Sequence, residues 1–379
     1  MSSDQRLIAE TITADRVIVV SELPSVRLAG GPTERGRTHG EAFADEIREN
    51  VATYLRRFEH RGVSEGAVRD RAAEFLSRMA DWNAAYAAEL RGIAAGSDVD
   101  ERDVAALNAR YEVLYSAYAA ENAGTDGCTS FALLPAATAN GHTYVGQNWD
   151  WIPAIADTLV VTEVHPDAGP RHLGVTEAGI VGAKMGVNER GIGLAVNGLV
   201  TPDDGENPFR KPFHVRCREV LSADRYDRAL EPLVSTPHAC SANFVLGHRD
   251  GEAIDVEASP SRVGYLHPTD GIVTHSNHFQ TEGFCSRMER QLPDSLYRAR
   301  RLRRLLSRPT RGATVDDVTD ALGDHFGRPA SICRHVDESA HQHERTRTDV
   351  SVVADLTDRC LYVARGSPCE SSYQAYRLD

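Results

Sequence analysis

The chain has 379 residues, of which 41% are hydrophobic and 26% charged, a composition that excludes a disordered or fibrous protein. Its length allows one large domain or two ordinary ones. Lys and Arg total 42 against 55 Asp and Glu, a formal charge of -13. A surface of that sign repels phosphate, so we expect no nucleic acid among its partners.

The N-terminal residues, the lack of a long apolar stretch and the cysteines narrow the class of protein further. Residues 1–10 contain acidic side chains where a signal peptide needs an apolar run, and no 18-residue apolar stretch occurs anywhere. We therefore expect a cytoplasmic protein that does not associate with membranes. The seven cysteines are scattered without a C-x-x-C pair, which indicates neither a disulfide framework nor a zinc knuckle.

The first third of the sequence has the apolar periodicity of helices. Apolar residues recur every three or four positions over 43–58, 68–93 and 103–118. Each set forms one stripe of an amphipathic helix. The turn-rich segment 122–127 then ends the helical region. We therefore predict a helical N-terminal segment over residues 1–127.

After this segment the pattern changes to many short strands. They are predicted at 129–134, 142–149, 158–164, 180–187, 192–199, 244–247, 253–257 and 271–275. Helices are predicted within 212–233 and 294–326, and a final hairpin over 349–363. Within the second helical stretch, the basic run 298–304 is interpreted as a solvated face. This order of elements predicts an α+β fold of stacked sheets covered by helices.

Cys128 lies where the helical segment ends and the first strand begins, directly after Gly127. Glycine can adopt a strained conformation that favours attack by the next thiol on the preceding carbonyl. A cut at this bond would free an α-amino group with a pKa of about 7.7–8.0, which can accept the thiol proton. From these two residues alone, a half-buried free cysteine without chemistry is the commoner interpretation.

A set of motifs around Cys128 resembles a known family. In chain order they are Asp126-Gly127-Cys128-Thr129, Gly146-Gln147-Asn148-Trp149-Asp150, Thr176-Glu177-Ala178-Gly179-Ile180, Gly186-Val187-Asn188, Val273-Thr274-His275-Ser276-Asn277-His278 and Ser331-Ile332-Cys333-Arg334. Their order and spacing resemble those of the penicillin acyltransferase (isopenicillin N acyltransferase) family of autoproteolytic N-terminal nucleophile (Ntn) hydrolases. Segments 34–40 and 89–94 resemble the propeptide of that family.

The resemblance implies a four-layer αββα fold and self-cleavage between Gly127 and Cys128. Residues 1–127 would form the helical α chain, and residues 128–379 the catalytic β chain with Cys128 at its N-terminus. The two chains are expected to stay associated, because the apolar stripes of the helices need the sheets to cover them.

The same resemblance implies roles for four polar residues. Asp150 would orient the α-amino group or the thiol, Asn277 would donate to the oxyanion, and Arg334 would support the thiolate. Asn197 resembles a second oxyanion donor of the related choloylglycine hydrolases. The residue types suit these roles. A carboxylate such as Asp150 can hold an amine as it gains and loses a proton, and an oxyanion needs preorganised hydrogen-bond donors such as asparagine amides. Taken singly, each residue also fits a turn, a loop cap or a surface ion pair.

Two pairs of histidines could suggest a metal site: His275 with His278, and His341 with His343. Neither pair comes with a third ligand at a recognisable spacing. Acyl-thioester chemistry needs only a thiol, a base and oxyanion donors. We therefore expect neither a metal nor a cofactor.

The resemblance implies a self-activated cysteine amidase or acyltransferase that acts on the amide bond of a small N-acyl compound through an acyl-thioester on Cys128. Two alternatives stay open. One is an acyl-CoA-dependent N-acyltransferase, and the other is an unprocessed relative that binds a ligand and catalyses nothing. The sequence does not distinguish water from an amine as the acceptor, and it does not identify the acyl group.

Overall fold

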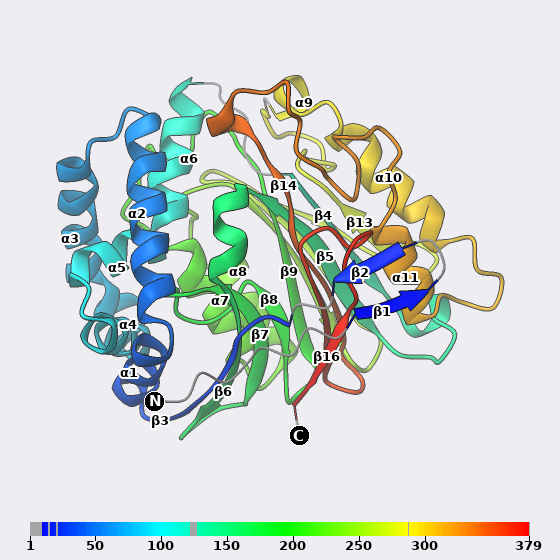
Figure 1. Ribbon diagram of the computed structural model, residues 1–379, viewed down its shortest axis with the longest axis horizontal. Helices are drawn as coiled ribbons and strands as arrows, with labels where there is room; N and C mark the ends of the chain where they lie inside the picture. The colour runs from blue at the N-terminus through cyan, green and yellow to red at the C-terminus, as the bar shows by residue number, and fades with distance from the viewer. Residues whose placement is uncertain (1–9, 14–15, 20–21, 122–126, 287, 379) are drawn as a thin grey trace.

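The computed structural model describes residues 10–13, 16–19, 22–121, 127–286 and 288–378. Two β-sheets lie at its centre, with the helices around them (Figure 1). The larger sheet has eight strands in the order β12-β11-β10-β9-β8-β7-β6-β3, and the smaller has six in the order β13-β4-β5-β14-β15-β16. A separate pair, β1 (Glu10–Thr13) and β2 (Arg16–Val19), forms a two-stranded sheet.

In the eight-stranded sheet all neighbours are antiparallel except β3 and β6, which are parallel. Its strands in spatial order are β12 (Val263–Leu266), β11 (Glu252–Ala258), β10 (Ala242–His248), β9 (Ile192–Gly198), β8 (Met185–Asn188), β7 (His172–Glu177), β6 (Leu159–Pro166) and β3 (Ser25–Gly30). The six-stranded sheet is antiparallel throughout. Its strands are β13 (Ile272–His275), β4 (Cys128–Leu133), β5 (Tyr144–Trp151), β14 (Arg347–Asp355), β15 (Cys360–Arg365) and β16 (Gln374–Arg377).

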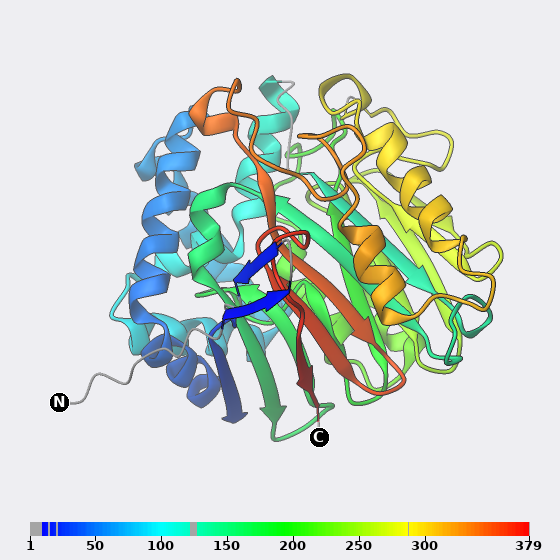
Figure 2. The ribbon, with the colours of Figure 1, turned by 45° about the vertical axis from the view of Figure 1, so that its right-hand side comes forward.

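The two sheets pack face to face. Strands β4 and β5 contact β9 and β10, and β14 contacts β8. On the outer side of the larger sheet, α7 (Phe213–Leu221) lies against β8 and β9, and α8 (Tyr226–Val234) against β11. On the outer side of the smaller sheet, α10 (Ser295–Leu306) lies against β4 and β13, and α11 (Val315–Leu322) against β14. The order helix, sheet, sheet, helix confirms the predicted αββα layers (Figure 2).

This layering buries the central strands on both faces. Every residue of β4, β5 and β9 is buried, because one face of each strand meets the other sheet and the opposite face meets helices. Polar residues in these strands, such as Asp150 and Asn197, are therefore held away from water and must find partners inside the protein.

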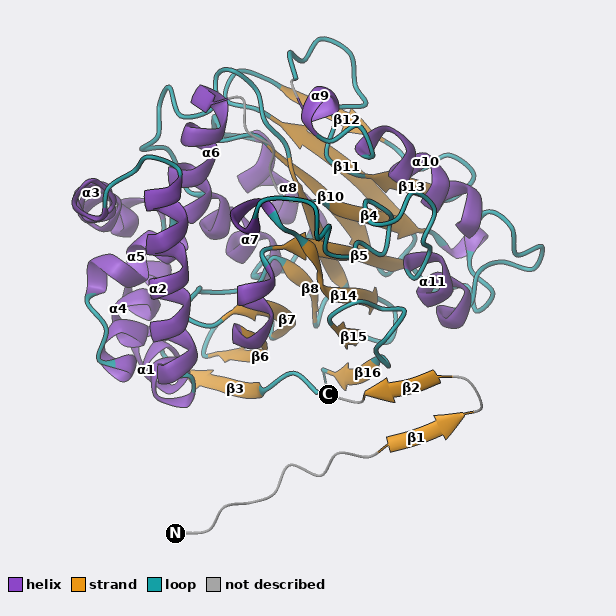
Figure 3. Ribbon diagram, turned by 45° about the horizontal axis from the view of Figure 1, so that its top comes forward, coloured by secondary structure: helices purple, strands orange, loops and turns teal. Residues whose placement is uncertain are grey.

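The helical N-terminal part stands beside the layered core (Figures 1 and 3). It consists of α1 (Pro32–Ala42), α2 (Ala44–His60), α3 (Glu65–Trp82), α4 (Ala84–Ser97), α5 (Glu101–Asn108) and α6 (Arg110–Glu121). A further short helix, α9 (Met288–Gln291), precedes α10. No described helix combines the length and the apolarity needed to cross a membrane.

The N-terminal part differs from the prediction in three ways. The helix expected over 103–118 is divided at Ala109 into α5 and α6. The helix expected over 68–93 is divided, because the side chain of Asn83 accepts a hydrogen bond from the Tyr86 amide at 2.9 Å and starts α4 anew. Residues 1–127 are also not purely helical, since β3 adds an edge strand to the larger sheet. Its mixed exposure, with only Leu28 fully buried, gives a weak strand pattern in the sequence.

Buried ion pairs tie this part to the core. Arg110 on α6 lies 2.6 Å from the carboxylate of Glu177 on β7, and Lys184 approaches the same carboxylate at 2.7 Å. Asn50 on α2 donates to the carbonyl of Ala178 at 2.7 Å. The contacts of Arg110 and Asn50 cross from residues 1–127 to residues 128–379, so they support continued association after a cut at Gly127.

Candidate active site

Cys128 is the first residue of β4, in the smaller sheet between β5 and β13. Its side chain is buried, with 1% of the residue exposed. The antiparallel pairing with β5 continues past the start of β4, so that the main-chain amide of Asp150 donates to the carbonyl oxygen of Gly127 at 2.8 Å. The peptide that joins Gly127 to Cys128 is thus fixed by the sheet.

Asn277 lies in the loop directly after β13 and faces the main chain of Cys128. Its Oδ1 accepts a hydrogen bond from the Cys128 amide at 2.8 Å, and its Nδ2 donates to the carbonyl of Gly198 at 3.0 Å. An asparagine amide has two N–H groups. One N–H group of Asn277 therefore fixes the side chain against Gly198, and the second could donate to an oxyanion.

Arg298, on α10, joins this group, and the sequence analysis missed it. Its Nη1 donates to the carbonyl of Cys128 at 2.6 Å, and its Nη2 donates to Oδ1 of Asn277 at 2.8 Å. Its Nε donates to Asp294 at 2.8 Å, so a carboxylate balances the buried charge. The residue is 0% exposed, and the prediction of a solvated face is wrong here.

The reason lies in the helical period. Arg298 falls four residues before Leu302 and eight before Leu306, both of which are buried against the smaller sheet. This spacing places the arginine on the apolar face of α10. Arg300 and Arg304, on the other face, are exposed as predicted. The signal was available in the sequence, but it was hidden within a run of like charges.

Asp150 and Arg334 form an ion pair next to this group. Arg334 Nε lies 3.3 Å from Asp150 Oδ2, and Arg334 also pairs with Asp294. The hydroxyl of Thr348 on β14 donates to Asp150 Oδ1 at 2.6 Å and accepts from the Arg334 amide at 2.9 Å. Burial raises the pKa of Asp150 to about 7, although Arg334 and Arg298 act in the opposite direction. This carboxyl group can therefore exchange a proton near neutral pH.

Gly127 is needed here for space. A Cβ at this position would lie 2.6 Å from Arg334 Nε and 2.9 Å from Asp150 Oδ2. The sequence analysis expected backbone strain, but Gly127 is not among the described glycines with positive φ. The absence of a side chain lets the Asp150–Arg334 pair approach the peptide before Cys128.

Asn197 lies on β9 of the facing sheet, opposite β4. Its Oδ1 accepts hydrogen bonds from the Ser130 hydroxyl and from Asn243 Nδ2, the latter at 3.1 Å. Its own Nδ2 is buried and has no hydrogen-bond partner among the described residues. Two other buried donors, Gln147 Nε2 and Trp149 Nε1, are likewise without a partner among the described residues, so this feature is not confined to Asn197. An oxyanion on a substrate bound at Cys128 would be a suitable acceptor.

The histidines considered in the sequence analysis have other partners. His275 Nε2 lies 2.7 Å from the Glu257 carboxylate, and His278 Nδ1 lies 2.8 Å from the Ser295 hydroxyl. His341 and His343 stack with His60. Within the described part of the chain, none of these four belongs to a group of three or more metal-binding side chains.

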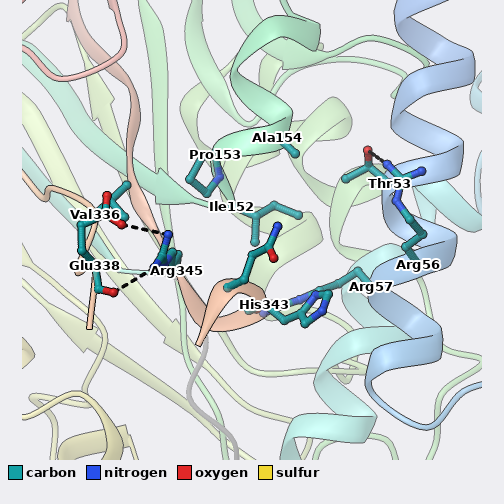
Figure 4. Close-up of a pocket in the computed structure, with 11 residues that line it drawn as sticks. Thr53, Arg56, Arg57, Ile152, Pro153, Ala154, Val336, Glu338, His343 and Arg345 are labelled. Carbon is teal, nitrogen blue, oxygen red and sulfur yellow. Dashed lines mark hydrogen bonds and ion pairs between the residues drawn. The ribbon is translucent and has the colours of Figure 1, made fainter. Parts of the chain in front are cut away.

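Two neighbouring cavities lie near the candidate active site; Arg334 lines the smaller one, and Cys128 is not among the lining residues of either. One, of about 330 Å³, is lined by Arg334 and by three further arginines, Arg57, Arg61 and Arg345. The other, of about 490 Å³, shares Arg57 and Arg345 with it. Figure 4 shows the larger cavity, where Arg56 and Arg57 on α2 face Ile152, Pro153 and Ala154 and the segment that carries His343 and Arg345.

Comparison with known proteins identifies the family to which the chain belongs. The sequence model of the family described as "Acyl-coenzyme A:6-aminopenicillanic acid acyl-transferase" matches residues 137–370, more than half of the chain. The protein belongs to this family. This confirms the resemblance found from the motifs and makes the protein an enzyme of amide hydrolysis or acyl transfer. The alternative of a relative without catalytic activity is not retained.

Two individual relatives are similar to the chain, and the name of the first agrees with this assignment. The chain is 29% identical over 352 residues to the acyl-coenzyme A:6-aminopenicillanic-acid-acyltransferase 40 kDa form of Emericella nidulans, covering 90% of this chain and 92% of that protein. It is 24% identical over 249 residues to an uncharacterized protein of Archaeoglobus fulgidus, covering 55% of this chain and 41% of that protein.

Solved structures also resemble the chain, at 12% identity. An N-acylethanolamine-hydrolyzing acid amidase ortholog of Caenorhabditis elegans matches with a TM-score of 0.48, covering 66% of this chain and 100% of that one. A mutant of the conjugated bile acid hydrolase of Clostridium perfringens matches with a TM-score of 0.45, covering 66% of this chain and 97% of that one.

Proposed function

We propose that the protein cuts itself between Gly127 and Cys128 and then acts as a cysteine amidase or acyltransferase, with Cys128 as the nucleophile. The observation that carries the proposal is the fixed peptide at the start of β4. Three hydrogen bonds fix this peptide. The Asp150 amide donates to Gly127 O, and the Cys128 amide donates to Asn277 Oδ1. Arg298 donates to Cys128 O.

This arrangement suits self-cleavage through an acyl shift. The Cys128 sulfur attacks the carbonyl carbon of Gly127, and the negative charge that develops on Gly127 O meets the Asp150 amide. The C–N bond then breaks, and the thiol proton ends on the departing Cys128 nitrogen. Water hydrolyses the resulting thioester, which leaves a carboxylate on Gly127 and a free amine on Cys128.

In the mature enzyme the freed α-amino group takes the thiol proton, because its pKa of about 7.7–8.0 leaves it partly neutral near pH 7. The thiolate attacks the acyl carbonyl of the substrate, and the ammonium returns the proton to the leaving amine. The acyl-thioester on Cys128 then passes its acyl group to water or to another amine. In this scheme Asn277 and Asn197 stabilise the oxyanion, and Asp150 and Arg334 hold the amine and the thiolate.

The substrate class is a small N-acyl compound, bound through the two neighbouring cavities, the smaller of which Arg334 lines. Arginines line both cavities, and Arg345 and Arg61 pair there with Glu338 and Glu344. A substrate carboxylate or phosphate would compete for these arginines, since guanidinium groups bind both in a bidentate manner. This feature, together with the activity that names the relative from Emericella nidulans, also supports the second candidate, an acyl-CoA-dependent N-acyltransferase.

Trapping of the acyl-enzyme tests the proposal. Purified protein is mixed with a panel of N-acyl amines or with acyl-CoA thioesters, quenched in acid within seconds, and analysed by mass spectrometry. We expect the acyl mass on the 128–379 chain, at Cys128. Hydrolysis of N-acyl amines without added amine would favour the amidase, whereas turnover that needs acyl-CoA and an acceptor amine would favour the transferase. Turnover with an unmodified Cys128 would contradict both.

A further inference from the structure

Outside the candidate active site, two cysteines and two histidines from separate parts of the chain come together. His325 follows α11, Cys333 and His335 lie in the loop that leads towards β14, and Cys369 lies in the loop between β15 and β16. The four ligand atoms all lie within 4.8 Å of one another. We propose that this group, called here the Cys2His2 cluster, binds a structural zinc ion.

The distances fit the edges of a zinc tetrahedron. With Zn–S near 2.3 Å and Zn–N near 2.0–2.1 Å, a regular site has N···N edges of about 3.3 Å and S···N edges of about 3.6 Å. In the protein, the Nε2 atoms of His325 and His335 are 3.1 Å apart. His335 Nε2 lies 3.6 Å from Cys333 Sγ and 3.4 Å from Cys369 Sγ. Little movement is needed to place an ion between them.

The chemistry of the ligands also points to zinc. Two thiolates and two neutral imidazoles are a usual ligand set of structural zinc sites and complete its four-coordinate shell. Binding releases the two thiol protons, so the site with its metal is electrically neutral. Neutrality matters because Cys333 is buried, where an uncompensated thiolate is costly. On the other side of the His335 ring, the Glu370 carboxylate lies 3.9 Å from Nδ1, which favours a metal bond through Nε2.

The position of the Cys2His2 cluster suggests what the ion does. Arg334 lies between Cys333 and His335 in the chain, and its side chain reaches Asp150 and Asp294. Zinc would join this segment to His325 and to Cys369, and thereby fix the main chain on both sides of Arg334. The ion touches neither substrate nor the Cys128 thiol, so it is a positioning element. This effect on turnover rests on the proposed function, whereas zinc binding itself does not.

Metal content of the full-length protein tests the inference independently of activity. The protein is purified under reducing conditions from a zinc-supplemented culture, and zinc is measured by mass spectrometry after gel filtration. We expect one zinc ion per chain. The Cys369→Ser variant should lose it and unfold at a lower temperature, while the matched control Cys285→Ser, at an exposed cysteine outside the cluster, should keep it.

Cobalt substitution gives a readout that needs no variant. Cobalt(II) bound by the wild-type protein should show the intense visible bands of a tetrahedral ion and a thiolate-to-cobalt charge-transfer band. If Cys369→Ser does not fold, cobalt(II) is added instead to His325→Ala, which removes a ligand that is not fully buried. This variant should lose the cobalt bands. A folded wild-type protein that binds neither ion would overturn the inference, as would zinc retained in both variants. A Cys333–Cys369 disulfide in the protein as it is isolated under reducing conditions would also overturn it.

Discussion

The main-chain amide of Asp150 donates a hydrogen bond to the carbonyl oxygen of Gly127 at 2.8 Å, while the Asp150 side chain pairs with Arg334 on the same side of that peptide. One residue on β5 therefore both polarises the carbonyl that the thiol would attack and fixes the arginine beside it. The geometry arises from the β4–β5 register, which continues one residue beyond the start of β4. Self-cleavage and substrate turnover would thus depend on the same strand pairing.

Gly127→Ala should slow self-cleavage strongly, by about 10²-fold if the reacting atoms shift by an ångström. The added Cβ would lie 2.6 Å from Arg334 Nε and 2.9 Å from Asp150 Oδ2, so the ion pair or the peptide must move. Cleavage is followed on denaturing gels after synthesis in vitro. Gly66→Ala is the matched control, since its Cβ meets nothing within 4 Å. Equal cleavage rates in the two variants would show that the space at Gly127 is not required.

Cys128→Ala should abolish both cleavage and turnover, because one thiol performs both reactions. Cys128→Ser should still cleave, more slowly, since a hydroxyl is a weaker nucleophile. Cys285→Ala, at an exposed cysteine, serves as the control for loss of a thiol. Retained amidase activity in Cys128→Ala would falsify the nucleophile assignment.

Asn277→Ala should cost about 2.7–4 kcal/mol of transition-state stabilisation if the residue donates to the oxyanion. The loss should fall on kcat with little change in KM, because the interaction forms only as charge develops. Asn197→Ala should act in the same direction, since its Nδ2 is a buried donor without a partner among the described residues. A change confined to KM would instead assign these side chains to substrate binding.

Arg298→Lys should keep the positive charge but lose the planar guanidinium group, whose two nitrogens donate to Cys128 O and to Asn277 Oδ1. We expect slower cleavage and a fall in kcat. Arg298→Ala should in addition destabilise the fold by about 3–5 kcal/mol, because it leaves Asp294 buried with one partner fewer. Arg304→Lys, on the exposed face of α10, should change neither property. Wild-type kinetics in Arg298→Lys would exclude a positioning role.

The raised pKa of Asp150 predicts a pH dependence of stability. Burial raises this pKa from 3.8 to about 7, so between these values the folded state holds more protons than the unfolded state. The contribution of Asp150 to the free energy of unfolding is therefore full below about pH 4 and is lost as the pH rises towards 7. In the uncleaved Cys128→Ala background, Asp150→Asn should remove this slope from urea unfolding measured between pH 4 and 8. Identical pH profiles with and without Asp150 would contradict the shift.

The sequence predicted the layers well because periodicity reports burial. Strands β4, β5 and β9 lie within two residues of their predicted bounds, and the hairpin of β14 and β15 lies where it was expected. The edge strand β3 was missed, because only one of its faces packs on the core and its pattern is correspondingly weak. Strand β7 was missed although it is buried throughout, and of the strand predicted at 180–187 only the last residues belong to β8.

The site was predictable only where local motifs mark it. Cys128, Asp150, Asn277 and Arg334 come from four separate segments, and the structure links them through shared hydrogen bonds. Arg298 was missed because its role depends on which face of α10 it occupies. The Cys2His2 cluster was missed for a different reason. Three of its ligands lie in the loop between α11 and β14 and the fourth in the loop between β15 and β16, and only the fold brings His325 and Cys369 together.

The masses of the purified protein under denaturing conditions test the central claim most directly. The account predicts two chains, one ending at Gly127 and one beginning at Cys128, which elute together from a native column because contacts such as Arg110–Glu177 join them. Cys128→Ala should give a single chain of 379 residues. One full-length mass from active wild-type protein, or a cut at any other bond, would contradict the account.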